Sequence, residues 1–444
     1  MTDSDNSPFL ELDATAVARS LSQIADREDD LAEVYFERRE EIVLPPPDYS
    51  PGVLCRRDEG LAVRLVREGK TWLASRDGLQ DGLLETALKQ VARLVPSTSY
   101  PVPNIDIRPA DDPSVPAELL DFPSLVNRAI RKRLAAFPLR LTVRFHRRWL
   151  RVVRPQLSPD PENESFFSCE ADLPWARWGT LLPRLDEKAA DRVARSLTSL
   201  FRSREAEPVV SGRRTVVLGS AACAVLLHEL VAHALETDTL ALGGRAEAAL
   251  GAELGGGLLN VLDDPAGAPE GVRRQTDDEG TLVIRRWLLR EGVVEQPLAD
   301  LHAAQRSSAL VPGAGRRSHR HEPPVPRSLH LELLSGDRSL TELLSDVAEG
   351  LFLTEVSRGS LDPLTGAFSL TASHGRLVVK GALADYVGPC CLKGRVAELL
   401  ASLRAVSDDS EVAGAGWCAK SGVKLPVWAT APAIVLDSME VEEW

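Results

Sequence analysis

Apolar residues follow two different periods in the first half of the chain. Spacings of three and four residues, typical of a helix with one buried face, occur over about residues 14–27, after Asp81 and over 186–202. Asp13 and Asp81 are suited to cap the first two of these helices. Strand-like alternation occurs over 31–44, in a hairpin over 60–75 and in a strand pair over 139–153. We therefore expect a sheet with flanking helices in this half.

Strand-like runs dominate the second half. An apolar strand over 215–218 is followed by Gly219 and Ser220, which open a further helix. The polar stretch 203–208 ends in a proline, which is typical of a domain boundary. These patterns predict an α+β fold. We expect an N-terminal α/β domain over 1–208, with a mixed or antiparallel sheet and flanking helices, and a β-rich C-terminal domain over 209–444 that carries the helix beginning at Ser220.

Two segments of unusual composition lie between these elements. Residues 96–123 are rich in proline and aspartate and predict irregular structure. Arginines gather over 128–154, where the alternation places many of them on the solvated face of the strand pair. A surface that faces an acidic partner subunit is a second hypothesis for this basic run.

The composition limits the possible classes of function. With 52 basic and 65 acidic side chains, the net charge is −13, which argues against a general nucleic-acid binder because such proteins present basic surfaces. The acidic N-terminus lacks the features of a signal peptide, and no apolar run reaches about 18 residues, so we expect no membrane span. Six scattered cysteines form no disulfide framework, which fits a reducing cytoplasm.

The helix beginning at Ser220 carries the motif H-E-x-x-x-H, formed by His228, Glu229 and His233. Neutral imidazoles bind zinc, and a nearby glutamate can take a proton from water and return it to a leaving group. The histidines are five residues apart, so on a regular α-helix they would point roughly 140° away from each other. A single π-bulge would absorb the extra residue and return both rings to one face. A metal site here therefore requires a local distortion of the helix.

The residues around this motif resemble the TldD half of the TldD/TldE (PmbA) family of zinc proteases. The family pattern H-E-x-x-G-H-x-x-E-x-D is matched at His228, Glu229, His233, Glu236 and Asp238, with Ala232 in place of the glycine. Residues 418–427 resemble the family's C-G-K-x-G-Q-x-V-P-V. Further matches lie at 32–37, 60–64, 277–280, 313–317, 326–327 and 362–369. The resemblance thus extends in order through nearly the whole chain.

This resemblance implies the roles of individual residues. His228, His233 and Cys418 would be the ligands of one Zn²⁺ per catalytic chain, with the fourth position left for water. Glu229 would be the base that activates the zinc-bound water. Two further acids, Glu236 and Asp238, would either support a ligand histidine through hydrogen bonds or lie on the helix surface.

Residues 311–327 predict a loop that carries two arginines and two histidines. Arg316 and Arg317 are candidates for binding a substrate carboxylate or backbone carbonyls. His319 and His321 could form a second metal site. We instead expect a surface or substrate loop, because the intervening arginine repels cations and no carboxylate pair frames the histidines.

The resemblance implies a cytoplasmic peptidase that hydrolyses unfolded or extended peptides. It also implies a dimer, in which this TldD-like catalytic half pairs with a TldE/PmbA-like subunit or with itself. Two other functions stay open. The replaced glycine at Ala232 suggests a non-catalytic partner or scaffold subunit, although the retained Glu229 and Cys418 argue against it. The alanines at family glycine positions also suggest a zinc amidohydrolase that tailors a small natural product.

Overall fold

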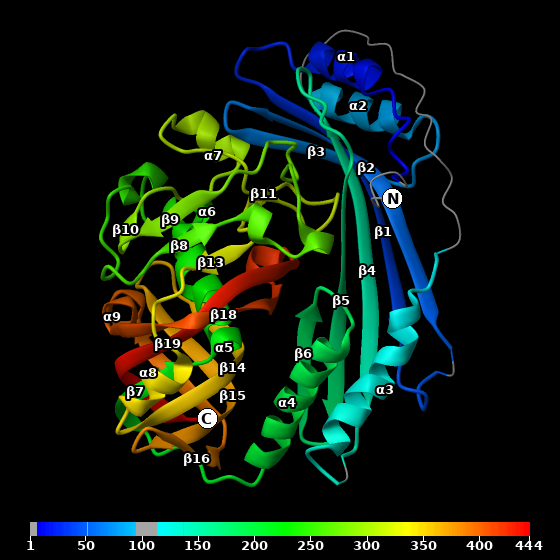
Figure 1. Cartoon of the computed structure of the whole chain (residues 1–444). Helices are drawn as coiled ribbons and strands as arrows, with labels where there is room; N and C mark the ends of the chain where they lie inside the picture. The colour runs from blue at the N-terminus through cyan, green and yellow to red at the C-terminus, as the bar shows by residue number, and fades with distance from the viewer. Residues whose placement is uncertain (1–6, 51, 95–112, 136) are drawn as a thin grey trace.

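The computed structural model describes residues 7–50, 52–94, 113–135 and 137–444, which build two large sheets (Figure 1). Helices cover one face of the first sheet, and the second sheet dominates the remainder of the chain. The predicted α+β class is therefore confirmed. Within the described ranges, every helix is too short or too polar to cross a bilayer.

The first sheet has six antiparallel strands in the order β3-β2-β1-β4-β5-β6. Its strands are β1 (Leu31–Leu44), β2 (Leu54–Arg67), β3 (Lys70–Asp77), β4 (Leu141–Val153), β5 (Glu162–Leu173) and β6 (Ala176–Leu182). Its helices are α1 (Ala14–Ile24), α2 (Leu83–Leu94), α3 (Ala117–Arg131) and α4 (Glu187–Ser203). The apolar stripes of α1 and α2 form one core against the sheet, and those of α3 and α4 form a second core further along the same face.

Most local predictions for this half are confirmed. The predicted strand over 31–44 is β1, and the predicted hairpin is formed by β2 and β3. Asp13 caps α1, since its Oδ1 accepts a hydrogen bond of 3.0 Å from the backbone N–H of Ala16.

Two local predictions are wrong. Residues 139–153 do not form a strand pair, because β4 is one long strand that pairs with β1 on one side and β5 on the other. The irregular structure predicted for 96–123 ends before α3 begins at Ala117, while residues 95–112 lie outside the described ranges. A buried stripe that includes Leu119, Phe122 and Val126 stabilises this helix despite the proline within it.

The second sheet has eleven strands, and part of it closes on itself. Strand β7 pairs with β14 in parallel and with β19 antiparallel, which completes a ring β7-β14-β15-β17-β19. Its strands are β7 (Gly212–Leu218), β8 (Val261–Asp263), β9 (Arg286–Arg290), β10 (Val293–Val294), β13 (Leu331–Leu333), β14 (Glu349–Leu361), β15 (Ala367–Val379), β16 (Ala382–Val387), β17 (Cys390–Arg395), β18 (Leu403–Cys418) and β19 (Leu425–Glu443).

Short elements complete this half of the chain. A separate two-stranded sheet is formed by β11 (Gly315–Arg316) and β12 (Val325–Pro326). The helices are α5 (Ser220–Leu226), α6 (Thr237–Leu240), α7 (Leu301–Arg306), α8 (Leu340–Ser345) and α9 (Val396–Ala401). The largest core of the described residues packs α5 and the turns after it against the ring of strands, so the predicted motif helix lies on a rigid support.

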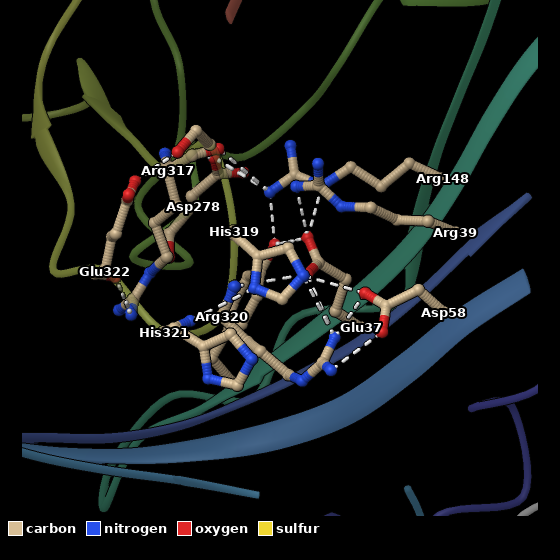
Figure 2. A network of polar contacts seen from close by, with 12 residues as sticks. Glu37, Arg39, Asp58, Arg148, Asp278, Arg317, His319, Arg320, His321 and Glu322 are labelled. Carbon is tan, nitrogen blue, oxygen red and sulfur yellow. Dashed lines mark hydrogen bonds and ion pairs between the residues drawn. The ribbon is translucent and has the colours of Figure 1, made fainter. Parts of the chain in front are cut away.

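A buried network of charges joins the two halves (Figure 2). On the helix-free face of the first sheet, Arg148 donates hydrogen bonds to Glu37 at 2.9 Å and to Asp278 at 3.1 Å. Arg64 donates to Glu279 at 2.7 Å. Burial favours a higher pKa for Glu37, but Arg39 and Arg148 outweigh it and lower this pKa to about 2.

The expectation that the basic run lies on a solvated face is wrong at its centre. The side chains of Arg148 and Arg151 are buried, because Arg148 meets carboxylates of the second half and Arg151 donates to the backbone carbonyl of Phe9 at 2.7 Å.

Replacing Arg148 with methionine is expected to lower the free energy of unfolding by about 3–5 kcal/mol, because Glu37 and Asp278 would remain buried without this cation. Urea unfolding measures the change. The matched control is Arg56→Met on the same sheet, since the Arg56 side chain is 73% exposed beside Glu41 and its loss should cost about 0.5 kcal/mol or less. Equal losses in the two variants would contradict a role for the buried network in stability.

Candidate metal centre

The helix distortion required by the motif is present. Strand β7 leads into α5, which continues as a π-helix over Leu227–Ala232. The backbone N–H of His233 donates to the carbonyl of His228, which is the i→i+5 bond of a π-turn. The centroids of the two imidazole rings consequently lie only 4.3 Å apart. The predicted π-bulge is confirmed, and Ala232 packs within the main core rather than preventing it.

Cys418 reaches these histidines from the far end of the sequence. It is the last residue of β18, and its Sγ lies 3.5 Å from Nε2 of His233. One ligand atom from each of His228, His233 and Cys418 lies within 4.8 Å of the other two, and all three residues are buried. The structure thus brings the three predicted ligands together, although 185 positions separate His233 from Cys418.

The chemistry of these donors fits a zinc ion. Both ring nitrogens of His228 are buried without a hydrogen-bond partner, which is costly unless a ligand is bound there. Burial, together with the nearby charge of His233, holds the pKa of His228 well below its usual value, so the ring is neutral as a metal ligand must be. Imidazoles and thiolates are both zinc ligands, and three protein ligands leave a fourth position open, as in catalytic zinc sites.

Glu236 orients the second histidine. Both carboxylate oxygens of Glu236 lie 2.9 Å from Nδ1 of His233, which directs Nε2 of the same ring towards Cys418. Burial opposes a charged His233, but the carboxylate of Glu236 and the contact with Cys418 outweigh it and raise the pKa of His233 to about 9. A proton and a metal ion therefore compete for this ring.

Two cations that the sequence reasoning missed hold Glu236 in place. Arg327 donates to Glu236 and to Asp238, both at 3.1 Å, and Lys420 contacts Glu236 as well. Glu236 thus contacts a predicted ligand directly, whereas Asp238 acts one contact further away. Both cations lie in segments matched to the family pattern, at 326–327 and 418–427. Their place in these segments is the feature of the sequence that could have indicated a role at the site.

Glu229 lies half-buried beside the cluster. Burial raises its pKa, which suits a group that must accept and then release a proton. Gly359 of β14 packs against it so closely that an added Cβ would lie 2.9 Å from Cδ of Glu229. The missing side chain at position 359 therefore leaves room for the glutamate, a feature that no motif indicated.

Two predicted substrate-binding residues of the loop over 311–327 do not lie at this centre, although Arg327 at the end of the loop does. Arg316 is 3% exposed and Arg317 is fully buried; neither lines the cavity beside the cluster. The backbone N–H of Arg317 donates to Asp278 at 2.7 Å, and its guanidinium contacts Glu33. Carboxylates already engage these arginines, so the structure gives them a role in joining the two halves rather than in contacting a substrate.

A second group of possible ligand atoms, on Glu37, Asp58 and His319, also lies within 4.8 Å (Figure 2). Arg320 donates to Asp58 at 2.6 and 2.8 Å, and Asp58 accepts a further bond of 2.7 Å from His319. These carboxylates already bind cations, so the group is an ion network. The expectation that no carboxylate pair frames this loop is wrong, because Asp58 and Asp77 both bind Arg320.

The cluster opens onto a cavity of about 1320 Å³ between the two halves of the chain. Glu229, His233 and Cys418 line it on one side, and residues of β6 and α4 line it on the other. Trp178 of β6 donates through Nε1 to Glu355 of β14 at 2.8 Å, which links the two walls. The candidate ligands His233 and Cys418 are therefore accessible from a wide cleft.

Fold and site together define an α+β protein with a candidate metal centre in a cleft. Residues 211–443 match the model of the PmbA/TldA metallopeptidase C-terminal domain, and the chain belongs to this PmbA/TldD family. The resemblance read from the motifs is confirmed. A family of metallopeptidases implies a metal, and the cluster of His228, His233 and Cys418 is a place in this chain where one could bind.

Individual relatives agree with this assignment. A TldD homolog of Haemophilus influenzae, named as a metalloprotease, is 30% identical over 239 residues, which cover 52% of this chain and 48% of that protein. A metalloprotease of Methanocaldococcus jannaschii is 30% identical over 224 residues, or 50% and 49%. The chain spans about half the length of the curated relatives it matches.

Solved structures share the fold over nearly the whole chain. TldE from Thermococcus kodakarensis superposes with a TM-score of 0.73 at 17% identity and covers 96% of this chain and 99% of its own. A putative modulator of a DNA gyrase from Thermotoga maritima gives 0.69 at 18% identity, with 95% and 98% covered.

Replacing Glu236 with alanine is expected to weaken zinc binding about 10- to 100-fold, because His233 loses the carboxylate that orients its ring. Competition with a chromogenic zinc chelator measures the affinity. Asp238→Ala serves as the control, since this carboxylate contacts Arg327 and not the histidine. Unchanged zinc affinity in the Glu236 variant would show that the contact does not support a ligand.

Proposed function

We propose that this chain is a zinc-dependent peptidase that hydrolyses unfolded or extended peptides. The supporting observation is the meeting of three ligand atoms within 4.8 Å, one of them on an imidazole without a hydrogen-bond partner, beside a cavity that also exposes Glu229. One zinc ion per catalytic chain would be held by His228, His233 and Cys418. This site, rather than a distant similarity of fold, carries the proposal.

When bound, zinc supplies Lewis acidity that polarises the scissile carbonyl and makes a water more acidic. Glu229 then takes the proton of the attacking water and delivers it to the departing amine. Its half-buried carboxylate, with a raised pKa, is suited to both transfers. Glu236 holds the Nδ1 side of His233, so the Nε2 side stays directed at the metal position.

The shape of the cavity favours an extended substrate over a small amide. Its volume of about 1320 Å³ exceeds the range of roughly 300–1,000 Å³ found for pockets of small ligands. Residues 176–181 of β6, the last strand of the first sheet, line it. A peptide could add to such a strand through backbone hydrogen bonds and pass Glu229 in an extended conformation.

The chain would have two domains, over 1–208 and 209–444, each built around one of the two sheets. It would pair with a TldE/PmbA-like subunit or with itself, which the shared fold with TldE supports. The cytoplasm is the proposed compartment, because Cys418 must stay reduced to bind a metal.

Replacing Glu229 with glutamine is expected to reduce peptide cleavage at least about 100-fold while zinc stays bound, because glutamine cannot accept the proton. Cleavage of a library of unstructured peptides and zinc content by elemental analysis are measured on the same samples. If neither peptides nor small amides are cleaved, the chain is a scaffold subunit. If small amides alone are cleaved, it is an amidohydrolase of another class.

Replacing Gly359 with alanine is expected to lower peptide cleavage by about 10- to 100-fold at unchanged zinc content. The new methyl group would overlap the Glu229 side chain and force its carboxylate out of position. Gly257→Ala is the matched control. Both glycines have ordinary backbone angles, but an added Cβ at Gly257 meets nothing within 4 Å. Full activity of the Gly359 variant would show that cleavage does not depend on the position of the Glu229 carboxylate.

A further inference from the structure

Aromatic surface is concentrated in the cavity beside the metal cluster. Four of the eight tryptophans in the sequence line it, namely Trp175, Trp178, Trp417 and the C-terminal Trp444. Trp175 and Trp178 lie on the wall formed by the first half of the chain, and Trp417 directly precedes Cys418 on the opposite wall. A large rigid apolar surface next to a reactive centre is typical of a site that selects a bulky side chain.

Contacts within the protein hold each of these three rings. Trp178 donates to Glu355 at 2.8 Å. Trp175 packs edge-on against Phe201, with ring centroids 5.7 Å apart. Trp417 lies 5.7 Å from the ring of Phe166 between centroids. Because these rings are already ordered, a ligand that packs on them loses little further conformational entropy.

Charge gives the cavity little selectivity of its own. Its lining includes four cationic side chains and three carboxylates, which are Arg177, Arg204, Arg358, Lys420, Glu170, Glu229 and Glu355. Several are already paired, since Lys420 contacts Glu236 and Glu355 accepts from Trp178. Neither acidic nor basic peptides are therefore favoured strongly, and the aromatic walls are left to discriminate.

Trp417 also contributes to the lining of a second cavity. A second cavity of about 620 Å³ lies between β1, β4 and the start of β19, and Trp417 is the one described residue that lines both. Its ring thus faces the space next to Cys418 and also borders the second cavity. Removing the ring would enlarge this space and weaken the fit for a bulky side chain.

We propose that Trp417, with Trp178 across the cleft, forms a subsite that accepts a large apolar or aromatic side chain next to the scissile bond. This inference rests on the proposed function for its catalytic meaning. As a binding site it stands on the arrangement of the rings. Hydrophobic subsites discriminate by roughly 10- to 200-fold between side chains that fill them and side chains that leave them empty.

The test measures binding without turnover. Zinc-loaded Glu229→Gln protein is titrated calorimetrically with unstructured peptides that differ only by Phe, Leu, Ala or Asp at one position. We expect the Phe and Leu peptides to bind at least about tenfold more tightly than the Ala and Asp peptides. Adding Trp417→Ala should reduce this preference to within a few-fold. Trp417→Phe should keep most of the preference, which would show that the loss in the alanine variant is not caused by misfolding.

The matched control is Trp287→Ala, because Trp287 lies on β9 and lines neither cavity. Equal affinity for all four peptides, or a preference that survives Trp417→Ala, would overturn the inference. Cleavage by the unmodified protein is measured separately. If preferential binding is found without any cleavage, the subsite stands and the proposed peptidase activity fails.

Discussion

The candidate site depends on one backbone hydrogen bond, from the N–H of His233 to the carbonyl of His228. A regular α-helix would place these imidazoles on different faces, and no other ligand could then complete a cluster with both. The π-turn shifts the second histidine by one position and brings the ring centroids to 4.3 Å. Its unusual geometry is stabilised by burial, since Leu227, Leu230 and Val231 of this segment pack into the largest core.

The cleft depends on a second constraint, the buried charges between the two halves. Arg64 and Arg148 of the first sheet reach Glu279 and Asp278 of the second half, and these acids in turn order the loop that carries Arg317. Such pairs are expensive to break once they are buried. They hold the first sheet against the second half, so the walls that carry Trp178 and Trp417 keep their separation.

The sequence predicted the local elements well and the long-range contacts poorly. Helix caps, strand alternation and the π-bulge are local properties, and Asp13, β1 and the five-residue spacing of the histidines indicated them correctly. Cys418 was predicted through a resemblance, because nothing in the local pattern places it near His233.

The residue roles that the sequence did not indicate correctly share a physical cause. In the sequence, Arg316 and Arg317 look like exposed cations in a polar loop. In the folded chain they are buried, and Arg317 contacts Glu33 and Asp278, which are far from it in sequence. The roles of Arg327, Lys420 and Gly359 likewise follow only from which segments meet in the folded chain. Periodicity reports which face of an element is buried, but not what that face contacts.

In the proposed site, one chain supplies two imidazoles and one thiolate to a single zinc ion. X-ray absorption spectroscopy of the zinc-loaded protein, purified alone, tests it most directly. The structure predicts one sulfur ligand at about 2.3 Å and nitrogen ligands at about 2.0–2.1 Å, with the sulfur contribution lost in the Cys418→Ala variant. A zinc environment without sulfur in the unmodified protein would contradict the account.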